Sequence, residues 1–504
     1  MSGLLFTDNE WDFETLKRVY DAIEEIGIED LGLDLYPNQI EIISAEQMLD
    51  AYSSHGMPLM YPHWSFGKIF AREQTLYQKG YTALAYEIVI NSNPCINFLM
   101  EENTMTMQTL VMAHAGLGHN HFFKNNYLFQ QWTDAEAILD YLNFARRYIA
   151  MCEEEFGLEA VEDIVDAAHA LMDQGVFRYS RPPRLSDEER LEKVRRRLAH
   201  DRATFNDLWR TLPQQDGEGP DAALDQSTDV AGLSDLAAED RQKMQLPEEN
   251  LLYFLEKHSP VLRPWQREIL RIVRNVAQYF YPMKQTKMMN EGCATFVHHY
   301  VLSTLYDQGR LGEGSMLEFL HSHAQVVFQP GFDDPRYRGF NPYALGFAMM
   351  SDIRRLCEDP TEEDRHWFPD IAGCGDWRAV LRHAWANFRD ESFILQYLSP
   401  RLMRELRLFE LRDADDAPYY EVAAIHDERG YTDVRAALAS MYDIGRLEPN
   451  LQVVEANLRS DRVLRLEHTR HRGVPLTQKG LDRTLGHVRR LWGHGVDLKA
   501  VDPV

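Results

Sequence analysis

The stretch that constrains the fold most runs from Tyr86 to Phe122 and reads YEIVINSNPCINFLMEENTMTMQTLVMAHAGLGHNHF. Its opening residues are aliphatic and β-branched, which favours a β-strand, and the Asn and Pro residues that follow Ile90 are typical of a turn. Apolar side chains then recur at Met107, Leu110 and Val111 with the spacing of a buried helix face. We therefore expect a strand, a turn and a helix that leads into a cluster of histidines.

Length and composition predict a globular protein with more than one core. The chain has 504 residues, beyond the roughly 250–300 residues at which a single hydrophobic core stops growing. Hydrophobic residues make up 44% of it, which is enough to fill large interiors and excludes global disorder. The formal charge of -26 argues against nucleic-acid binding, and basic runs such as RLEKVRRRLAH are typical of solvated helix faces.

Cysteine usage and the apolar runs bear on the compartment. The five cysteines are scattered and form no CxxC pair, so the sequence predicts reduced thiols and no disulfide framework. The N-terminus reaches acidic residues within a few positions and lacks the pattern of a secretion signal. No run approaches the roughly 20 apolar residues of a membrane span. We therefore expect a cytoplasmic protein without a membrane span.

Shifts in composition divide the chain into four parts. Residues 1–212 form an N-terminal helical region that carries the histidine cluster. Residues 213–244 are acidic and poor in aromatics, which predicts a flexible insertion that cannot offset the entropy of ordering. Residues 245–415 form a second helical region, expected to pack with the first as one main body. Residues 416–504 form a C-terminal α+β module.

The C-terminal module follows a regular alternation of elements. A strand (YYEVAAI) precedes a helix from Thr432 to about Tyr442, and two strands follow (LQVVEANL and VLRLEHT). A helix from Gln478 to Trp492 and a last strand (VDLKAV) complete the order βαββαβ. That order predicts a ferredoxin-like module, and the fold class of the whole chain is α+β with a mainly helical main body.

Two segments hold residue types that suit a metal site. The first is AHAGLGHNHF and the second is NEGCATFVHH, which runs from Asn290 to His299. Imidazole and carboxylate are the mixture that zinc prefers in hydrolases. With 19 histidines in the chain, clusters can also arise as hydrogen-bonded core residues. The candidate donors are His114, His119, His121, Glu291, His298 and His299.

Helix geometry limits which donors can share one ion. Residues five apart lie about 140° around an α-helix, so His114 and His119 face apart unless the helix ends or contains a π-bulge, which the glycines between them allow. Glu291 and His298 share a helix face but lie about 10 Å apart along the axis. We therefore expect Glu291 to be a ligand and His298 to contact the substrate or support the ligands from behind.

The sequence resembles the stage V sporulation protein R (SpoVR) family over nearly its whole length. The resemblance is carried by YPHWSFGK, INSNPCINFLMEENTMTMQTLVMAHAGLGHN, MNEGCATFVHHY, VVFQP, FNPYALGFAM, EEDRHWFPDIAG, DESFILQYLSP and RLEPNLQV. It implies a role in formation of the spore cortex, a peptidoglycan layer, or in the stationary-phase stress response of bacteria that form no spores. It also implies two partners, a serine protein kinase and a von Willebrand A-like protein.

A local resemblance links NEGCA to the gluzincin metallopeptidases, whose third zinc ligand is a glutamate in an NEGxA pattern. It implies a zincin-like main body in which His114, His119 and Glu291 hold Zn²⁺. The HExxH motif of those enzymes is replaced by HAGLGH, so Ala115 stands where the glutamate base is expected. Glu101 and Glu102 are candidate replacements close by in sequence, although acids there are also favoured by the dipole at a helix start.

Two functional hypotheses follow. In the first, the protein is a zinc-dependent hydrolase that cleaves an amide bond in a peptide or a cell-wall precursor, with Glu102 and His298 as catalytic residues. In the second, it is a non-catalytic regulator or scaffold in a kinase-linked stress pathway. Donor residues beside glycine-rich segments favour the hydrolase, and the missing HExxH favours the regulator.

Overall fold

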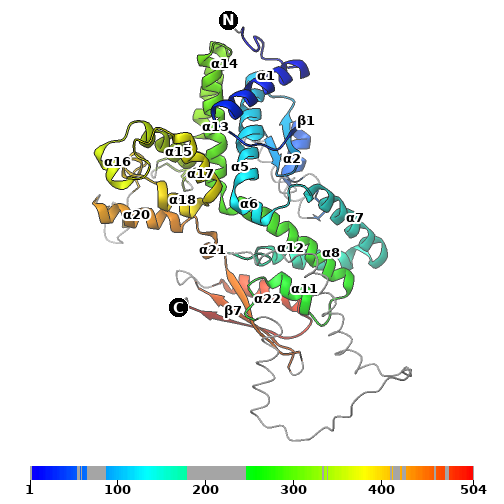
Figure 1. Cartoon of the computed structure of the whole chain (residues 1–504). Helices are drawn as coiled ribbons and strands as arrows, with labels where there is room; N and C mark the ends of the chain where they lie inside the picture. The colour runs from blue at the N-terminus through cyan, green and yellow to red at the C-terminus, as the bar shows by residue number, and fades with distance from the viewer. Residues whose placement is uncertain are drawn as a thin grey trace, which may run out of the picture.

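The computed structural model (Figure 1) describes most of the chain. The acidic stretch 213–244, for which the sequence predicts a flexible insertion, lies outside the described residues. These are residues 3–53, 57, 60–64, 87–178, 246–331, 334–337, 339–408, 411–412, 421–422, 427–458, 461–470 and 476–502.

The N-terminal part joins a helix to a small mixed sheet. Helix α1 (Phe13–Glu25) begins where the Asp12 carboxylate accepts a hydrogen bond from the amide of Thr15, and a π-helical turn, η1 (Ile26–Asp30), extends it. The sheet has the strand order β1-β3-β2, in which β1 and β3 are parallel and β2 and β3 antiparallel. Its strands are β1 (Asn38–Ile43), β2 (Glu87–Ile90) and β3 (Cys95–Met100).

The strand and the helix expected after Tyr86 are both present, with a second strand between them. A turn that contains Pro94 reverses the chain, so residues after it form β3 before the helix begins. Thr104 caps the first helix by accepting a hydrogen bond from the amide of Met107. The helices that follow are α4 (Met105–Val111), η2 (Met112–His119), α5 (Asn120–Asn125), α6 (Tyr127–Trp132), α7 (Ile138–Phe156) and α8 (Leu158–Ala170). Helix α2 (Ala45–Ser53) lies between β1 and β2 in the chain.

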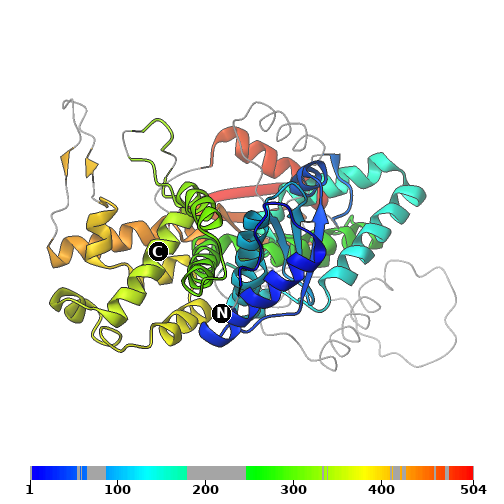
Figure 2. The same ribbon diagram turned by 90° about the horizontal axis from the view of Figure 1, so that it is seen from above.

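The second half of the main body is helical and surrounds one central helix, α13 (Lys287–Asp307). Figures 1 and 2 show α13 between the N-terminal helices and the group α15 to α18. Helix α12 continues past Pro282, where the sequence pattern predicts its end, to Gln285. The other helices are α11 (Leu251–His258), α12 (Pro264–Gln285), α14 (Glu313–Val326), α15 (Pro342–Glu358), α16 (Glu362–Trp367), α17 (Trp377–Asn387), α18 (Asp390–Tyr397) and α19 (Pro400–Glu405).

Two large cores hold the molecule together, as the length of the chain predicts. The first contains buried side chains of α1, α4 and η2 together with those of α13, α15 and α17. The second joins α7 and α8 to α11 and α12 and to the C-terminal strands and helix. Each core therefore includes residues from before and after the segment 179–245. The two helical regions that the sequence separates pack against each other through both cores.

The C-terminal sheet differs from the expected ferredoxin-like module. It has three strands in the order β6-β7-β8, with β6 and β7 antiparallel and β7 and β8 parallel. Of the strand expected first in the module, the structure describes β5 (Glu421–Val422), which pairs with β4 (Leu411–Arg412) in a two-stranded sheet. The elements are β6 (Asn450–Ala456), β7 (Leu464–Thr469), α22 (Gln478–Trp492) and β8 (Val496–Val501).

The helix expected second in that module belongs to the main body. Helix α20 (Glu428–Ser440) packs against α18, and its buried side chains Tyr431, Leu438 and Ala439 enter the first core. Only the chain after α21 (Ile444–Leu447) therefore forms the C-terminal sheet. The four-stranded ferredoxin-like arrangement is not confirmed, because its first strand and helix are used elsewhere.

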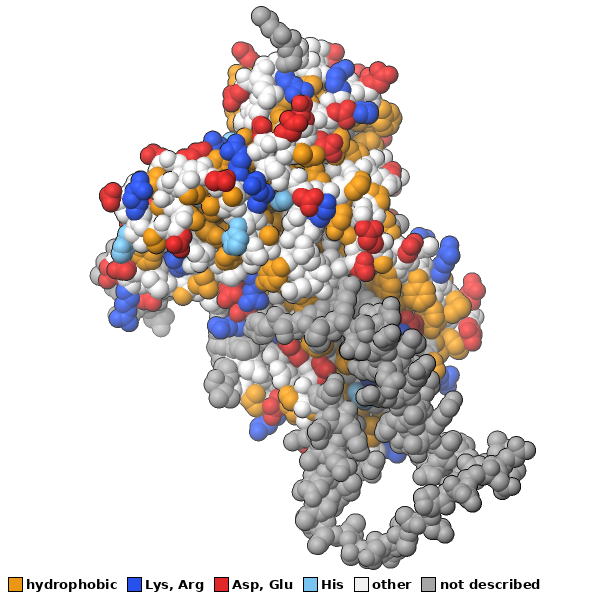
Figure 3. All heavy atoms as spheres, in the orientation of Figure 1, with side chains coloured by type: hydrophobic (Ala, Val, Ile, Leu, Met, Phe, Trp, Pro, Cys, Tyr) orange, Lys and Arg blue, Asp and Glu red, His pale blue; other side chains and the backbone are white. Residues whose placement is uncertain are grey.

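The surface carries both signs of charge. Figure 3 shows Lys and Arg side chains interspersed with Asp and Glu over the visible face, without a large field of one sign. Among the described residues, no helix is both long and apolar enough to cross a membrane.

Candidate metal centre

Four side chains from three elements converge at one point in the main body. Nε2 of His114 lies 3.2 Å from Oε1 of Glu87 and 3.8 Å from Oε2 of Glu291. Nε2 of His119 lies 3.8 Å from the same Glu87 oxygen and 3.5 Å from the same Glu291 oxygen. The histidines belong to η2, Glu87 opens β2 and Glu291 lies in α13. The structure thus brings together the three ligands that the sequence predicts, and adds Glu87.

The π-helix explains how His114 and His119 face one another. In a π-helix the backbone hydrogen bonds join residues five apart, so side chains with this spacing lie above one another rather than on different faces. Residues Met112–His119 adopt this conformation, and the two imidazole rings meet edge to face with centroids 4.7 Å apart. The π-bulge that the glycine-containing HAGLGH segment predicts is therefore confirmed, and it is longer than a single turn.

Glycines allow the helices that carry the donors to approach closely. A Cβ atom on Gly118 would lie 2.4 Å from Cα of Ala294, so only glycine allows η2 to contact α13 at this distance. On the other side of α13, a Cβ atom on Gly292 would lie 2.6 Å from Cα of Gly346 in α15. Gly292 of the NEG motif therefore allows α13 and α15 to pack closely, while the adjacent Glu291 contributes its carboxylate to the site.

A buried aspartate fixes the first turn of α13. The carboxylate oxygens of Asp390 accept hydrogen bonds of 2.9 Å from the amides of Met288 and Met289. Burial raises the pKa of Asp390 to about 7, although these two amides act in the opposite direction. The start of α13, and with it Asn290 and Glu291, is held in place by α18.

Hydrogen bonds behind the histidines set their tautomers. Nδ1 of His119 lies 2.9 Å from Oδ1 of Asn290, which can only accept, so Nδ1 carries the proton and Nε2 keeps a free lone pair. Nδ1 of His114 lies 2.9 Å from Nδ1 of His298, and Nε2 of His298 lies 3.0 Å from Nδ1 of His323. Donation outward along this chain, from His114 to His298 to His323, leaves Nε2 of His114 free as well.

The electrostatics of the two carboxylates differ. Burial raises the pKa of Glu87 to about 7, and the neighbouring Glu291 carboxylate acts in the same direction. The pKa of Glu291 is lowered, because His114, His119 and a hydrogen bond from Tyr343 outweigh its burial. Glu291 is therefore the permanent anion of the site, and Glu87 can gain or lose a proton near neutral pH.

The two histidines differ in the same way. Burial lowers the pKa of His119 to about 4, and the neighbouring His114 adds to this effect. Burial also opposes protonation of His114, but the two carboxylates overcome it and raise the pKa of that ring. His119 is therefore neutral, as a metal ligand must be. At His114 the two carboxylates favour a proton, which a bound metal ion would displace.

The donor atoms lie close enough together to surround one metal ion. The four separations between imidazole nitrogen and carboxylate oxygen are 3.2–3.8 Å. Glu87, His114 and His119 can each offer one donor atom, and these three atoms lie within 4.8 Å of one another. Within the described part of the chain, the buried Oε2 of Glu291 has no hydrogen bond, as expected of an atom that awaits a cation.

The other candidate residues lie at different distances from this centre. His298 lies directly behind His114, and the ring of His299 packs near His323, with centroids 4.8 Å apart. Glu102 is exposed, and Oε1 accepts a hydrogen bond from the amide of Ala45 at the start of α2. No contact brings Glu102 to the cluster, so its catalytic role stays a prediction without support from the geometry.

One residue of the centre was not anticipated from sequence. Glu87 lies in EIVI, the first strand of the quoted stretch, and pairs with Leu99 of β3. The sequence signal that could have identified Glu87 is an acidic residue at the start of an otherwise apolar strand. The sequence alone does not tell which way that strand runs, so its distance from the histidines could not be judged.

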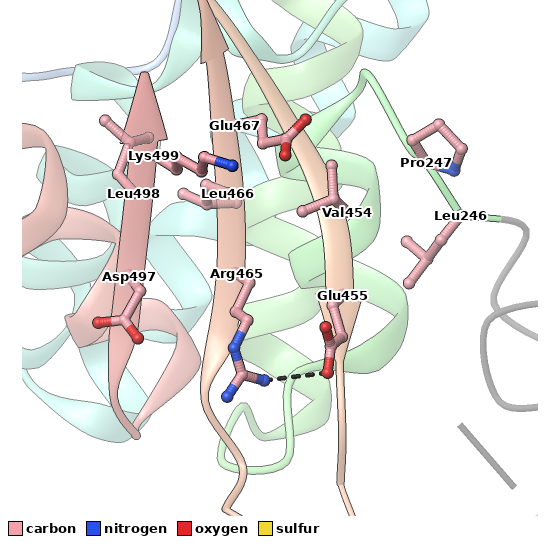
Figure 4. A pocket seen from close by; sticks show the side chains of 10 residues that line it. All are labelled: Leu246, Pro247, Val454, Glu455, Arg465, Leu466, Glu467, Asp497, Leu498 and Lys499. Atoms are coloured by element: carbon pink, nitrogen blue, oxygen red, sulfur yellow. Dashed lines mark hydrogen bonds and ion pairs between the residues drawn. The ribbon is translucent and has the colours of Figure 1, made fainter. Parts of the chain in front are cut away.

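A pocket lies in another part of the molecule, against the C-terminal sheet. Figure 4 shows a cavity of about 450 Å³ against the C-terminal sheet, lined by residues of β6, β7 and β8 and by residues 246–247. Its best-defined polar contact is the ion pair between Arg465 and Glu455, at 3.1 Å. No histidine lines it, and the metal-binding cluster is the stronger candidate for chemistry.

Comparison with known proteins places the chain in a family. The chain belongs to the SpoVR family: the model described as SpoVR like protein matches residues 10–447, and the SpoVR-like C-terminal domain matches residues 449–503. The boundary between the two matches falls where the chain leaves α21 and enters β6. The chain is 53% identical over 490 residues, 97% of its length, to "Uncharacterized protein YcgB" of Escherichia coli (strain K12), of which the alignment covers 92%. No solved structure matches.

Proposed function

We propose that this protein is a zinc-dependent hydrolase of amide bonds, with His114, His119 and Glu291 as the residues that hold the ion. The observation that carries the proposal is the convergence of two imidazole nitrogens and two carboxylate oxygens at separations of 3.2–3.8 Å. Zinc bound there polarises a substrate carbonyl and lowers the pKa of a water molecule.

Glu87 is the general base of this proposal. Its pKa of about 7 suits a group that takes up a proton and releases it again at neutral pH. Its Oε1 lies 3.2 Å from Nε2 of His114 and 3.8 Å from Nε2 of His119. Ala115 stands where a glutamate base is expected in the helix, and Glu87 of β2 takes that role in this proposal.

His298 and His323 orient the centre rather than touch the substrate. Both rings are buried, and the chain His114–His298–His323 holds His114 in the tautomer that presents Nε2 to the ion.

The substrate class follows from family membership together with the proposed chemistry. The SpoVR resemblance implies work on the spore cortex or in stationary-phase stress, and an amide bond in a peptidoglycan precursor or in a protein that controls wall assembly is a reachable target in the cytoplasm. A serine protein kinase and a von Willebrand A-like protein are the proposed partners.

Metal analysis of the purified protein tests the first half of this proposal. We expect about one zinc per chain after reconstitution, and loss of zinc in His114→Ala, His119→Ala and Glu291→Gln. His121→Ala is the matched control, because His121 is equally buried but bonds to Asp34 outside the cluster. Absence of stoichiometric metal in the wild type would overturn the proposal.

The variant Glu87→Gln tests the second half. As a general base, Glu87 can be replaced with retention of zinc and loss of hydrolysis, measured on a panel of short peptides, N-acyl amino acids and peptidoglycan precursors. If Glu87→Gln loses zinc, Glu87 is a fourth ligand and the base lies elsewhere. If the loaded wild-type protein cleaves nothing on the panel, a metal-stabilised regulator becomes the better account.

A further inference from the structure

A pair of cysteines lies far from the metal centre, at the end of α15. Cys357 is buried in the last turn of that helix, and Cys374 is exposed in the loop between α16 and α17. The sequence, which has five scattered cysteines and no CxxC motif, gives no hint that two of them meet.

Backbone hydrogen bonds place the two cysteines next to one another. The amide of Gly373 donates to the carbonyl of Leu356 at 2.9 Å, and the amide of Gly375 donates to the carbonyl of Cys357 at 3.0 Å. Cys374 is therefore held between two bonds to the helix end that carries Cys357. The two thiols themselves are in hydrogen-bond contact.

The loop is built to keep this position. Gly373 and Gly375 have φ angles of 79° and 77°, a left-handed conformation that favours glycine, on both sides of Cys374. The helix α16, between the two cysteines in sequence, is tied back to α15 by the ion pair of Arg355 with Asp364 at 2.6 Å. These contacts hold the segment around Cys374 against the end of α15 that carries Cys357.

We propose that Cys357 and Cys374 form a reversible disulfide when the protein meets a peroxide. The exposed Cys374 thiolate attacks one oxygen of hydrogen peroxide, gains that oxygen as a sulfenic acid and releases hydroxide, which takes up a proton to become water. The sulfur of Cys357 then attacks the sulfur of Cys374, the S–O bond breaks, and a second water leaves with the thiol proton. Two thiols and one peroxide thus give one disulfide and two waters.

The environment of Cys357 shapes this reaction. Burial raises the pKa of the Cys357 thiol to about 12, and the neighbouring Cys374 thiol adds to the effect. A thiol that rarely ionises attacks slowly, but the reduced pair also gains no stability from a thiolate, so the disulfide persists once it has formed. The bond closes a loop around α16 and joins the end of α15 to the segment that leads into α17.

Peptide mapping of the full-length protein after treatment with hydrogen peroxide tests the proposal. Trypsin separates Cys357 and Cys374 into the peptides 356–365 and 366–378. We expect these two peptides to appear as one linked species, about 2 Da lighter than the sum of the reduced peptides, and to separate after treatment with dithiothreitol. Cys152→Ser, which removes a cysteine of the other core, should leave the linked species unchanged.

Variants of the pair make the result decisive. Cys374→Ser, an exposed replacement that leaves the core intact, should abolish the linked species, and Cys357→Ser should leave Cys374 as a sulfenic acid that a dimedone probe traps. The proposal is overturned if wild-type Cys374 proceeds to sulfinic or sulfonic acid without the linked species. It is also overturned if either cysteine pairs with Cys95, Cys152 or Cys293 instead.

Discussion

Two groups of histidines in this molecule look alike in sequence and differ in geometry. In the first, His114 and His119 face Glu87 and Glu291 with their Nε2 atoms aimed at a shared point. In the second, which comprises Tyr61, His63, Trp64, Asp166 and His169, the rings of the two histidines stack with centroids 4.6 Å apart.

The polar side chains of the second group form hydrogen bonds with one another. Nε2 of His63 lies 2.8 Å from Oδ1 of Asp166, and the indole N–H of Trp64 donates to the same oxygen at 2.6 Å. Nε2 of His169 pairs with the hydroxyl of Tyr61. In the described part of the chain, His63 and Trp64 share the Asp166 carboxylate, and the two imidazole rings stack, whereas those of His114 and His119 meet edge to face. The comparison shows that convergence of lone pairs, rather than the number of histidines, distinguishes a metal centre from a polar part of a core.

The largest loss of stability and of zinc is expected from a substitution at the contact between η2 and α13, the helices that carry three residues of the first group. Gly118→Ala places a methyl group 2.4 Å from Cα of Ala294, so η2 and α13 must separate, which should cost about 3 kcal/mol or more of unfolding free energy and remove zinc. The matched control is Gly116→Ala, whose new Cβ finds no described atom nearer than 3.5 Å. Denaturant unfolding and zinc content measure both. Equal effects of the two substitutions would contradict the packing argument.

The next effect comes from the ring behind His114. His298→Ala removes the acceptor that holds the tautomer of His114, and we expect zinc affinity to fall by about 10–100-fold. His63→Ala removes a histidine that pairs with Asp166 and belongs to the second group, and zinc affinity should stay unchanged. Competition with a chromogenic chelator provides the dissociation constants, and a similar loss in both variants would remove the distinction between the groups.

The first group should also make hydrolysis depend on pH near neutrality. Because the pKa of Glu87 is raised to about 7, its carboxyl is protonated below that pH and cannot accept a proton from a water molecule. The rate of hydrolysis should therefore fall by up to about tenfold per pH unit below 7, and level off above it. A pH profile of hydrolysis by the zinc-loaded protein measures this. A flat profile between pH 6 and 8 would show that Glu87 is not the general base.

The smallest effect belongs to the second group. Asp166→Asn weakens the hydrogen bonds from His63 and Trp64, and we expect a loss of only about 1 kcal/mol in unfolding free energy, with zinc content unchanged. Thermal unfolding with parallel metal analysis measures this. A change in zinc content would link the two groups in a way that their separate contacts do not suggest.

Local patterns allowed part of the centre to be predicted. The glycines between His114 and His119 indicated a departure from α-helical geometry, and the π-helix of η2 is that departure. That inference rests on spacing within a short segment, where helix geometry is well determined. The placement of Glu291 beside these histidines is implied by the resemblance of NEGCA to the gluzincin pattern, and not by spacing.

Contacts between distant elements could not be predicted in the same way. Glu87 reaches the centre only because β2 pairs antiparallel with β3, and no periodicity in the sequence fixes that register. In the C-terminal part, the order of strands and helices predicts a ferredoxin-like module that includes the helix after YYEVAAI. That helix, α20, packs its apolar side chains into the first core and not against the sheet. Competition between two cores for the same helix is a property of tertiary packing that a pattern of elements does not contain.

X-ray absorption at the zinc edge of the reconstituted protein tests the central claim most directly. We predict one zinc per chain, bound only by nitrogen and oxygen at about 2.0–2.2 Å, with the scattering pattern of two imidazole rings. A sulfur neighbour at about 2.3 Å, a single imidazole in the wild type, or the absence of stoichiometric zinc would contradict the account.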